Sequence, residues 1–296
     1  MKGSGNMRAF EDCNPIASAL YFLTAAGICM FSESPVIFSL SLFGALILYI
    51  VRNGIKNGGI HMLSLLLFVV MSLANPLFSH NGVTVLFVIN NNPVTLEAFV
   101  YGVFASVMII SVLYWFSSFS QIMTSDKLLY IFSAFSPKLA LMLSMALRYV
   151  PLFEKQAKNV SKSQKALGIY REDNITDRFK GGVRVFSVMV TWALENGIIT
   201  ADSMRARGYG IGRRSHFSLF RFRLGDILLL CVSAVVLFVV LLCGGEMKFD
   251  FYPAISMPVT SVAGVVGYTA YGVLVLLPTL IEIKEALRWK YLKSKI

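Results

Sequence analysis

The sequence predicts an all-α integral membrane protein with about six transmembrane helices and two long helices on its cytoplasmic side. Three observations support this fold class. Of the 296 residues, 56% are hydrophobic and only 15% are charged. In a soluble chain about a quarter of the residues are normally charged. The apolar residues gather in runs close to the roughly 20 residues that cross a bilayer. A long basic segment with helical periodicity separates the fourth run from the fifth.

Six apolar runs are the candidate spans. They cover about 14–31, 35–51, 60–78, 97–117, 225–243 and 262–282. The first two are short and are joined by Ser32-Glu33-Ser34 alone, so they form either a tight hairpin in the membrane or one irregular anchor. A cleaved signal peptide is the alternative for the first run, since Lys2 and Arg8 precede it. A second apolar run follows directly, however, and no small-residue cleavage site stands out.

The distribution of positive charge predicts the partner class and the orientation. The net charge is +11, and a positive charge of this size is compatible with nucleic acid as a partner. Lys and Arg are sparse through 57–126, abundant from Lys127 to Arg223, and frequent again in Lys284–Lys295. A basic surplus that alternates between spans is the positive-inside pattern. We therefore expect a lipid bilayer and no nucleic acid.

The same pattern assigns each connection to one side of the cell membrane. The connection 79–96 contains no Lys or Arg and is expected outside. The Arg52–Lys56 loop, the central segment and the tail are expected inside, with both termini in the cytoplasm. We divide the chain into N-terminal spans, a coupling-helix region, and C-terminal spans with a basic tail, at 1–118, 119–224 and 225–296.

Residues with catalytic or metal-binding chemistry are scattered. The four cysteines lie in or beside apolar runs without a CxxC pair, and the three histidines form no cluster. No Walker A sequence occurs. The glycine run Gly208–Gly212 lacks the preceding strand and the Lys-Ser/Thr of a phosphate loop, and we interpret it as a hinge. We expect a non-catalytic protein without cofactor or bound metal.

The central segment predicts a first long helix from about Pro137 to Leu167. Pro151 is expected to kink or interrupt it near Leu147–Arg148. Beyond that point the helix is amphipathic, with lysines stacked on one face at Lys155, Lys158, Lys162 and Lys165.

A second long helix is predicted from an N-cap at Asn174 to Met204. Asp177 in its first turn suits the positive end of the helix dipole. The helix is apolar on most sides, so we expect it to pack against the first long helix and the inner ends of the spans.

The two helices end alike, in Ser163–Tyr170 and Ser203–Gly210. Both share the pattern Ser-x-basic-Ala-x-Gly, in which Gly168 and Gly208 suit the left-handed position that ends a helix. One interpretation is that many helices end this way and that the cations obey the positive-inside rule. The other is a pair of basic helix tips that enter acidic grooves on two similar partner proteins, as arginine pairs bidentately with carboxylates.

The second of these ends, Met204–Gly210, resembles the Ala-Arg-Gly signature of the transmembrane (T) subunits of energy-coupling factor (ECF) transporters, the EcfT/CbiQ-type family. Three further segments resemble elements of that family in the same order: Asn75–Phe78 followed by Gly82, Ala146–Pro151 and Gln164–Gly168. The resemblance covers roughly residues 60–240.

The resemblance implies a complex with two ABC-type ATPase subunits and a small substrate-binding (S) membrane subunit. The long helices would be coupling helices, and Arg207 would sit in an ATPase groove. The residues implied in ATPase coupling are Ala206, Arg207, Gly208 and Arg205 in the second helix, and Ala166, Leu167, Gly168 and Lys165 in the first. The resemblance also implies a structural role in coupling for Arg148 and Pro151.

The sequence departs from the family pattern at two places. Leu167 stands where the family usually has Arg, so Lys165 or Arg171 would supply the cation, or that ATPase would present a more apolar groove. The unequal ends suggest two different ATPases. The second departure is the apparent extra crossing at 262–282 with its basic tail.

The expected function is therefore energy coupling in an ABC-type importer of a vitamin or a metal ion, with the substrate chosen by the S subunit. Two alternatives remain: a self-sufficient secondary transporter or channel, and a membrane-embedded enzyme or scaffold.

Overall fold

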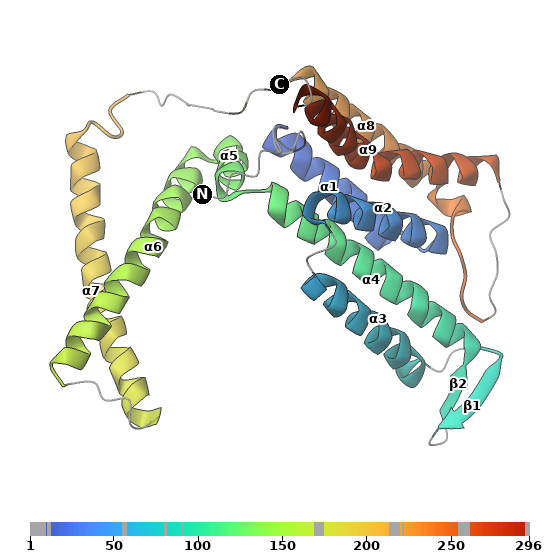
Figure 1. Ribbon diagram of the computed structural model, residues 1–296, viewed down its shortest axis with the longest axis horizontal. Coiled ribbons are helices and arrows are strands. Elements are labelled where there is room, and N and C mark those ends of the chain that lie inside the picture. Colours follow the sequence, from blue (N-terminus) through green and yellow to red (C-terminus); the bar gives the residue numbers. More distant parts are fainter. Residues whose placement is uncertain are drawn as a thin grey trace. The chain divides into compact units, whose positions relative to one another are not determined.

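The computed structural model describes residue 10 and residues 13–54, 58–79, 82–89, 92–168, 175–212, 220, 222–253 and 261–293. The chain divides into two compact units (Figure 1). The first, which we call the bundle, comprises Met1–Lys127 and Phe220–Ile296. The second, which we call the insert, comprises Leu128–Leu219.

The bundle is built from apolar helices at the positions of the predicted runs. They are α1 (Pro15–Phe31), α2 (Pro35–Asn53), α3 (Gly58–Phe78), α4 (Leu96–Ile122), α8 (Leu224–Cys243), the short 3-10 turn η2 (Gly244–Glu246) and α9 (Val262–Lys293). By length and composition, α2, α3, α4, α8 and α9 can each cross a membrane, whereas α1 is a shorter apolar helix of 17 residues. The predicted all-α membrane class is confirmed.

The first two apolar runs form two separate helices joined by a short turn. Asn14 caps α1 by accepting a hydrogen bond from the Ile16 N–H at 3.0 Å, and Pro15 occupies the first helical turn. Pro35 opens α2 in the same way, since its fixed φ suits the first position of a helix. The hairpin interpretation is therefore correct, and the irregular anchor is wrong.

A small β-hairpin before α4 was not among the predicted elements. Strands β1 (Val85–Ile89) and β2 (Asn92–Thr95) pair antiparallel. The Glu97 carboxylate, in the first turn of α4, accepts hydrogen bonds from the Thr84 hydroxyl at 2.7 Å and the Thr84 N–H at 3.2 Å. This carboxylate ties the hairpin to the start of the helix.

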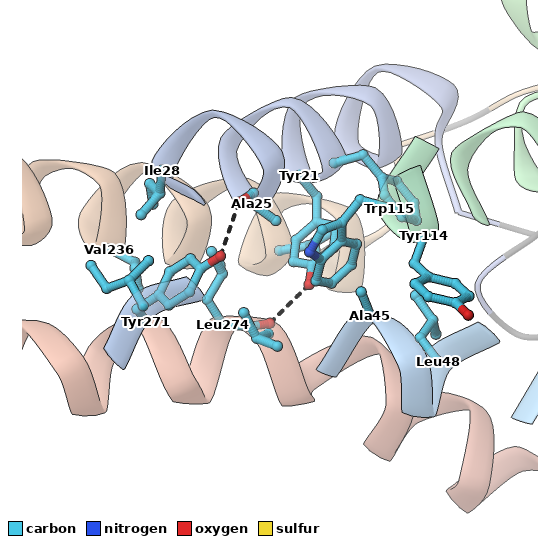
Figure 2. Packing of buried hydrophobic residues seen from close by; sticks show 14 of the residues in the cluster. Tyr21, Ala25, Ile28, Ala45, Leu48, Tyr114, Trp115, Val236, Tyr271 and Leu274 are labelled. Carbon is cyan, nitrogen blue, oxygen red and sulfur yellow. Dashed lines mark hydrogen bonds between the residues drawn. The ribbon is translucent and has the colours of Figure 1, made fainter. Parts of the chain in front are cut away.

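An aromatic core holds the bundle together (Figure 2). The Tyr21 hydroxyl donates to the Leu274 carbonyl at 2.9 Å, and the Tyr271 hydroxyl donates to the Ala25 carbonyl at 3.1 Å, so two bonds join α1 to α9. The Trp115 ring N–H donates to the Ser41 hydroxyl at 3.0 Å and joins α4 to α2. In hydrocarbon, polar groups need such partners because water is absent.

Two sets of contacts made by buried charged side chains fasten helix ends, and neither set was predicted. Asp226, in the first turn of α8, accepts from the Asn14 N–H at 3.0 Å and the Arg223 N–H at 2.9 Å, which links the starts of α1 and α8. Near the end of α2, the Arg52 Nη1 donates to the Glu282 carboxylate of α9 at 2.9 Å. The sequence predicts Arg52 in a loop, whereas it lies buried in the last turn of α2. Its place on the cytoplasmic side stays a prediction.

The insert contains most of α5 (Ser125–Phe135) and the whole of α6 (Pro137–Ala166) and α7 (Ile175–Ala206). The Tyr149 and Thr200 hydroxyls lie 2.6 Å apart, and the rings of Phe153 and Trp192 pack edge to face with centroids 5.4 Å apart. Earlier residues of α6 thus meet later residues of α7, so the two helices run antiparallel. This confirms that they pack together; the expected N-cap at Asn174 lies outside the described residues.

Helix α6 is continuous through Pro151, so of the two predicted effects near Leu147–Arg148 the interruption is wrong, and the kink stays a prediction. Proline removes one backbone hydrogen bond of the helix interior. Tyr149 and Phe153, on either side of Pro151, both contact α7. Packing on each side of the proline compensates for the missing bond and keeps the helix in one piece.

Candidate functional site

The two helix ends that share the Ser-x-basic-Ala-x-Gly pattern also share a backbone conformation. Helix α6 ends at Ala166 and Gly168 has φ +69°; helix α7 ends at Ala206 and Gly208 has φ +79°. A positive φ of this size is the left-handed region that glycine enters without steric cost. The predicted role of both glycines in ending the helices is confirmed.

Hydrogen bonds close the two ends in a similar way. At α7 the Gly208 N–H donates to the Arg205 carbonyl at 2.9 Å, and the Tyr209 N–H donates to the Met204 carbonyl at 3.0 Å. This pair of bonds is the Schellman motif. At α6 the Gly168 N–H donates to the Lys165 carbonyl at 3.0 Å, which is the equivalent of the first bond. The backbone at both tips is thus held in a defined shape.

The side chains at the two tips differ in chemistry. Arg205 and Arg207 are exposed beside the end of α7, where cations stabilise the negative end of the helix dipole. At the end of α6, Lys165 is exposed and Leu167 is 71% exposed. One tip is therefore strongly basic, and the other combines a cation with an exposed apolar side chain.

The alternative cation Arg171 lies outside the described residues, as do Arg213 and Arg214 after the glycine run. Within that run, Gly210 also has a positive φ, +94°, and the Ile211 N–H donates to the Gly208 carbonyl at 3.3 Å. Successive turns follow α7, with no strand before the glycines. This local geometry fits a change of chain direction rather than a phosphate loop.

The two tips do not meet in one site. Because α6 and α7 run antiparallel, the end of α6 and the end of α7 lie at opposite ends of the pair (Figure 1). Arg148 and Pro151 lie within α6, and Arg148 is 17 residues before Lys165 in the numbering, or about 25 Å along the helix. The candidate residues therefore form two separate groups at the helix ends and a third group in the middle of α6.

One face of α6 is basic over its second half. The four lysines Lys155, Lys158, Lys162 and Lys165 are all exposed. Lys158 Nζ lies 2.6 Å from the Glu154 carboxylate, and this hydrogen bond, together with the lysine charge, holds the pKa of Glu154 below its ordinary value. A solvated face of this kind suits an anionic partner.

Helix α7 carries two stripes with helical spacing. One stripe is buried or half-buried and includes Trp192 and Thr200, which contact α6. Its members are Gly181, Val185, Met189, Trp192, Asn196 and Thr200. A second stripe is apolar and between 42% and 74% exposed: Phe179, Val183, Phe186, Val190, Leu194 and Ile198. A continuous exposed apolar stripe marks a surface that another molecule or a membrane covers.

Across the described part of the chain, no three His, Cys, Asp or Glu side chains come together as a possible metal site. The buried ion pair of Arg52 and Glu282 joins residues that are 230 positions apart, and no pattern in the sequence relates them. The exposed apolar stripe of α7, by contrast, can be detected in the sequence. The second long helix is apolar on more sides than one partner helix can cover.

Comparison with known proteins finds a family model, described as cobalt transport protein CbiQ, that matches residues 14–219. EcfT 1 of Listeria monocytogenes, an energy-coupling factor transporter transmembrane protein, is 31% identical over 100 residues, which cover 33% of this chain and 38% of the relative. EcfT of Listeria innocua, of the same description, is 35% identical over 101 residues, with coverage of 33% and 38%. The chain thus spans well under half of each relative.

Proposed function

The chain belongs to the CbiQ family of cobalt transport proteins, and from this premise we propose that it is the energy-coupling transmembrane subunit of an ECF-type importer. Family membership and the apolar helices identify it as a multi-pass membrane transport protein. In the proposal, the chain transmits ATP-driven movement of two cytosolic ATPases to a small substrate-binding membrane subunit. Both relatives are named as transmembrane proteins of energy-coupling factor transporters, which supports this assignment.

The observation that supports the proposal best is the matching pair of closed helix ends. Gly168 and Gly208 hold the same left-handed conformation at opposite ends of an antiparallel helix pair. Two similar ATPases need two similar contacts on one chain, and a rigid pair with a tip at each end supplies them. Arg207 is the proposed tip residue for one ATPase, because its planar fork pairs bidentately with carboxylates.

The neighbouring residues complete the two proposed contacts. Around Arg207 these are Arg205, Ala206 and Gly208, and at the other tip they are Lys165, Ala166, Leu167 and Gly168. Leu167 makes the second contact more apolar, so two different ATPases are the preferred arrangement. Arg148 and Pro151 lie in the part of α6 that packs on α7 and are proposed to transmit force between the tips.

The exposed apolar stripe of α7 is the proposed contact for the substrate-binding subunit. Its six side chains are too exposed for a helix in water, and a membrane subunit offers an apolar surface that would cover them. Movement of the tips would then reach the S subunit through the same helix. The stripe lies on a different set of positions from the one that faces α6, so both contacts can exist together.

Further parts of the proposal follow from this role. The chain itself is non-catalytic, and ATP hydrolysis takes place on the ATPases. It lies in the cell membrane with both termini in the cytoplasm, and its functional regions are 1–118, 119–224 and 225–296. The transported vitamin or metal ion is selected by the S subunit.

The test is a purification of the tagged full-length chain in mild detergent, with co-purifying proteins identified by mass spectrometry. The variant Arg207→Glu is compared with Arg178→Glu, which changes another exposed cation, in the first turn of the same helix. We expect the wild type and Arg178→Glu to retain ATPases and a small membrane protein. The amount of ATPase that co-purifies with Arg207→Glu should fall at least about tenfold, since breaking a charged interface pair costs roughly 2–5 kcal/mol. The decrease for Leu167→Ala should be much smaller.

Retention of the ATPases by Arg207→Glu at the wild-type level would refute the assigned contact. Recovery of a single ATPase species would refute the preference for two different ones. Substrate transport by the chain alone in liposomes would replace the whole proposal with a self-sufficient transporter.

A further inference from the structure

Three hollows surround the last turn of α1. This helix has 17 residues and is about 25 Å long, whereas the hydrocarbon core of a bilayer is about 30 Å thick. The hollows have volumes of about 440, 390 and 410 Å³, within the range of roughly 300–1,000 Å³ found for ligand sites.

Two of the hollows are apolar grooves on either side of α1. The first lies between α1 and α8 and includes Leu237 and Leu241, and the second lies between α1 and α4 and includes Trp115 and Phe119. Gly27 lines both grooves, and a Cβ added there would meet no atom within 4 Å. Both grooves therefore have room for a chain-like apolar group along α1.

The third hollow has a different chemistry. It is lined by the aromatic rings of Tyr101, Phe249 and Tyr252 and by the carboxylates Glu33 and Asp250. The ring centroids of Tyr101 and Tyr252 are 5.7 Å apart. Aromatic faces together with carboxylates favour an ammonium group, through cation–π attraction and through charge.

The hollows adjoin one another at the turn after α1. Ser32 and Glu33 line both the groove beside α8 and the aromatic hollow. Lys248 lines the same groove, with its Nζ 3.8 Å from the Glu33 carboxylate. A negative and a positive side chain thus stand together where the groove beside α8 meets the aromatic hollow.

We propose that these hollows form a binding site for one zwitterionic phospholipid with an ammonium headgroup, from the leaflet next to the α1–α2 turn. The ammonium lies in the aromatic hollow near Glu33 and Asp250, and the phosphate lies near Lys248. One acyl chain occupies each groove beside α1. Because acyl chains pack equally well in the surrounding bilayer, the headgroup contacts are expected to provide the selectivity.

The test measures lipid binding to the delipidated full-length chain in detergent by native mass spectrometry. Palmitoyl-oleoyl phosphatidylethanolamine is compared with the phosphatidylglycerol that has the same acyl chains but no ammonium. We expect one phosphatidylethanolamine to be retained with about fivefold preference, the effect of one solvent-accessible cation–π contact. The double variant Glu33→Gln/Asp250→Asn should remove the preference, and Glu246→Gln, an exposed carboxylate that does not line these hollows, should keep it.

A second pair of variants tests the grooves. Gly27→Phe places a ring at the open position that lines both grooves and should reduce retention of either lipid about fivefold or more. Gly225→Phe adds the same ring at another open glycine of a bundle helix and should leave retention unchanged.

Equal retention of the two lipids by the wild-type chain, or a preference that survives the double variant, would overturn the proposal. Glu33 is exposed, so this comparison is informative even if Gly27→Phe fails to fold. Displacement of the lipid by soluble phosphoethanolamine at equal concentration would also overturn it, because the ligand would then be a solute without acyl chains.

Discussion

At the scale of single residues, the left-handed backbone at Gly208 is what ends α7 directly after Arg207. A side chain at φ +79° places its Cβ too close to the neighbouring carbonyl, at a cost of about 1–2 kcal/mol. The nearest atom to an added Cβ is 3.7 Å away, so crowding by other residues plays no part. The requirement for glycine here is conformational.

We therefore predict that Gly208→Ala loosens the closed end of α7. The Tyr209 amide, which donates to the Met204 carbonyl, should exchange its hydrogen about tenfold faster, as expected for roughly 1.4 kcal/mol of lost local stability. Gly208→Asn should have a smaller effect, because asparagine tolerates this backbone region. Hydrogen exchange followed by mass spectrometry or NMR measures the difference.

Gly182→Ala is the matched control. Gly182 lies inside α7 and an added Cβ there meets nothing within 4 Å, so alanine should stabilise the helix by up to about 1 kcal/mol. If the Tyr209 amide exchanges equally in Gly208→Ala and the wild type, the left-handed end is absent in solution.

At the scale of helices, the buried ion pair between Arg52 and Glu282 fastens α2 to α9. The Arg52 side chain is fully buried and that of Glu282 is 6% exposed. Removing one member of such a pair leaves an uncompensated charge in a water-poor environment, at a cost of about 3–5 kcal/mol. The exposed pair of Glu154 and Lys158 in α6 is of the kind that contributes about 0–1 kcal/mol.

We predict that Arg52→Glu lowers the thermal stability of the detergent-purified chain strongly, and that adding Glu282→Arg restores most of the loss. Thermal unfolding monitored by loss of monodisperse protein provides the measurement. The equivalent exchange of Glu154 and Lys158 should leave the midpoint nearly unchanged. A double variant as unstable as Arg52→Glu alone would show that the charges do not stabilise each other.

The helices were predictable from the sequence to the extent that their signals are local. Run length and helical spacing predicted α1 to α4 and α6 to α9. The glycine after each basic tip predicted the positive φ found there. The interruption at Pro151 was wrong because its compensation comes from side chains of α7. The β1–β2 hairpin was missed because its apolar residues do not alternate with polar ones, which is the usual strand signal.

At the scale of the whole chain, the orientation of the bundle in the membrane remains a prediction from the positive-inside pattern. It places the β1–β2 hairpin and η2 outside the cell and the insert inside. Single cysteines in a cysteine-free background can test this with a membrane-impermeant maleimide.

We predict that Gly245→Cys, at an exposed glycine of η2, reacts in intact cells. Ser163→Cys, exposed near the end of α6, should react only after the membrane is permeabilised. The opposite accessibility would place the insert outside and exclude contact with cytosolic ATPases.

Long-range contacts set the limit of what the sequence could predict. The residue pair Arg52 and Glu282 and the bond from Asn14 to Asp226 join positions more than 200 apart, at separations of 230 and 212. The grooves beside α1 likewise depend on how three helices pack. Residue types and spacing identified the tips of α6 and α7, whereas these features required the folded arrangement.

The insert is one uninterrupted stretch of chain, Leu128–Leu219, flanked on both sides by parts of the bundle. The insert can therefore be exchanged as one continuous segment, that is, as a cassette. Substitutions that retune partner choice can accumulate within this stretch while the lipid-facing helices keep their own packing, and a relative's cassette can be exchanged at its two boundaries as a single piece. In this way the same set of membrane helices could work with different ATPases.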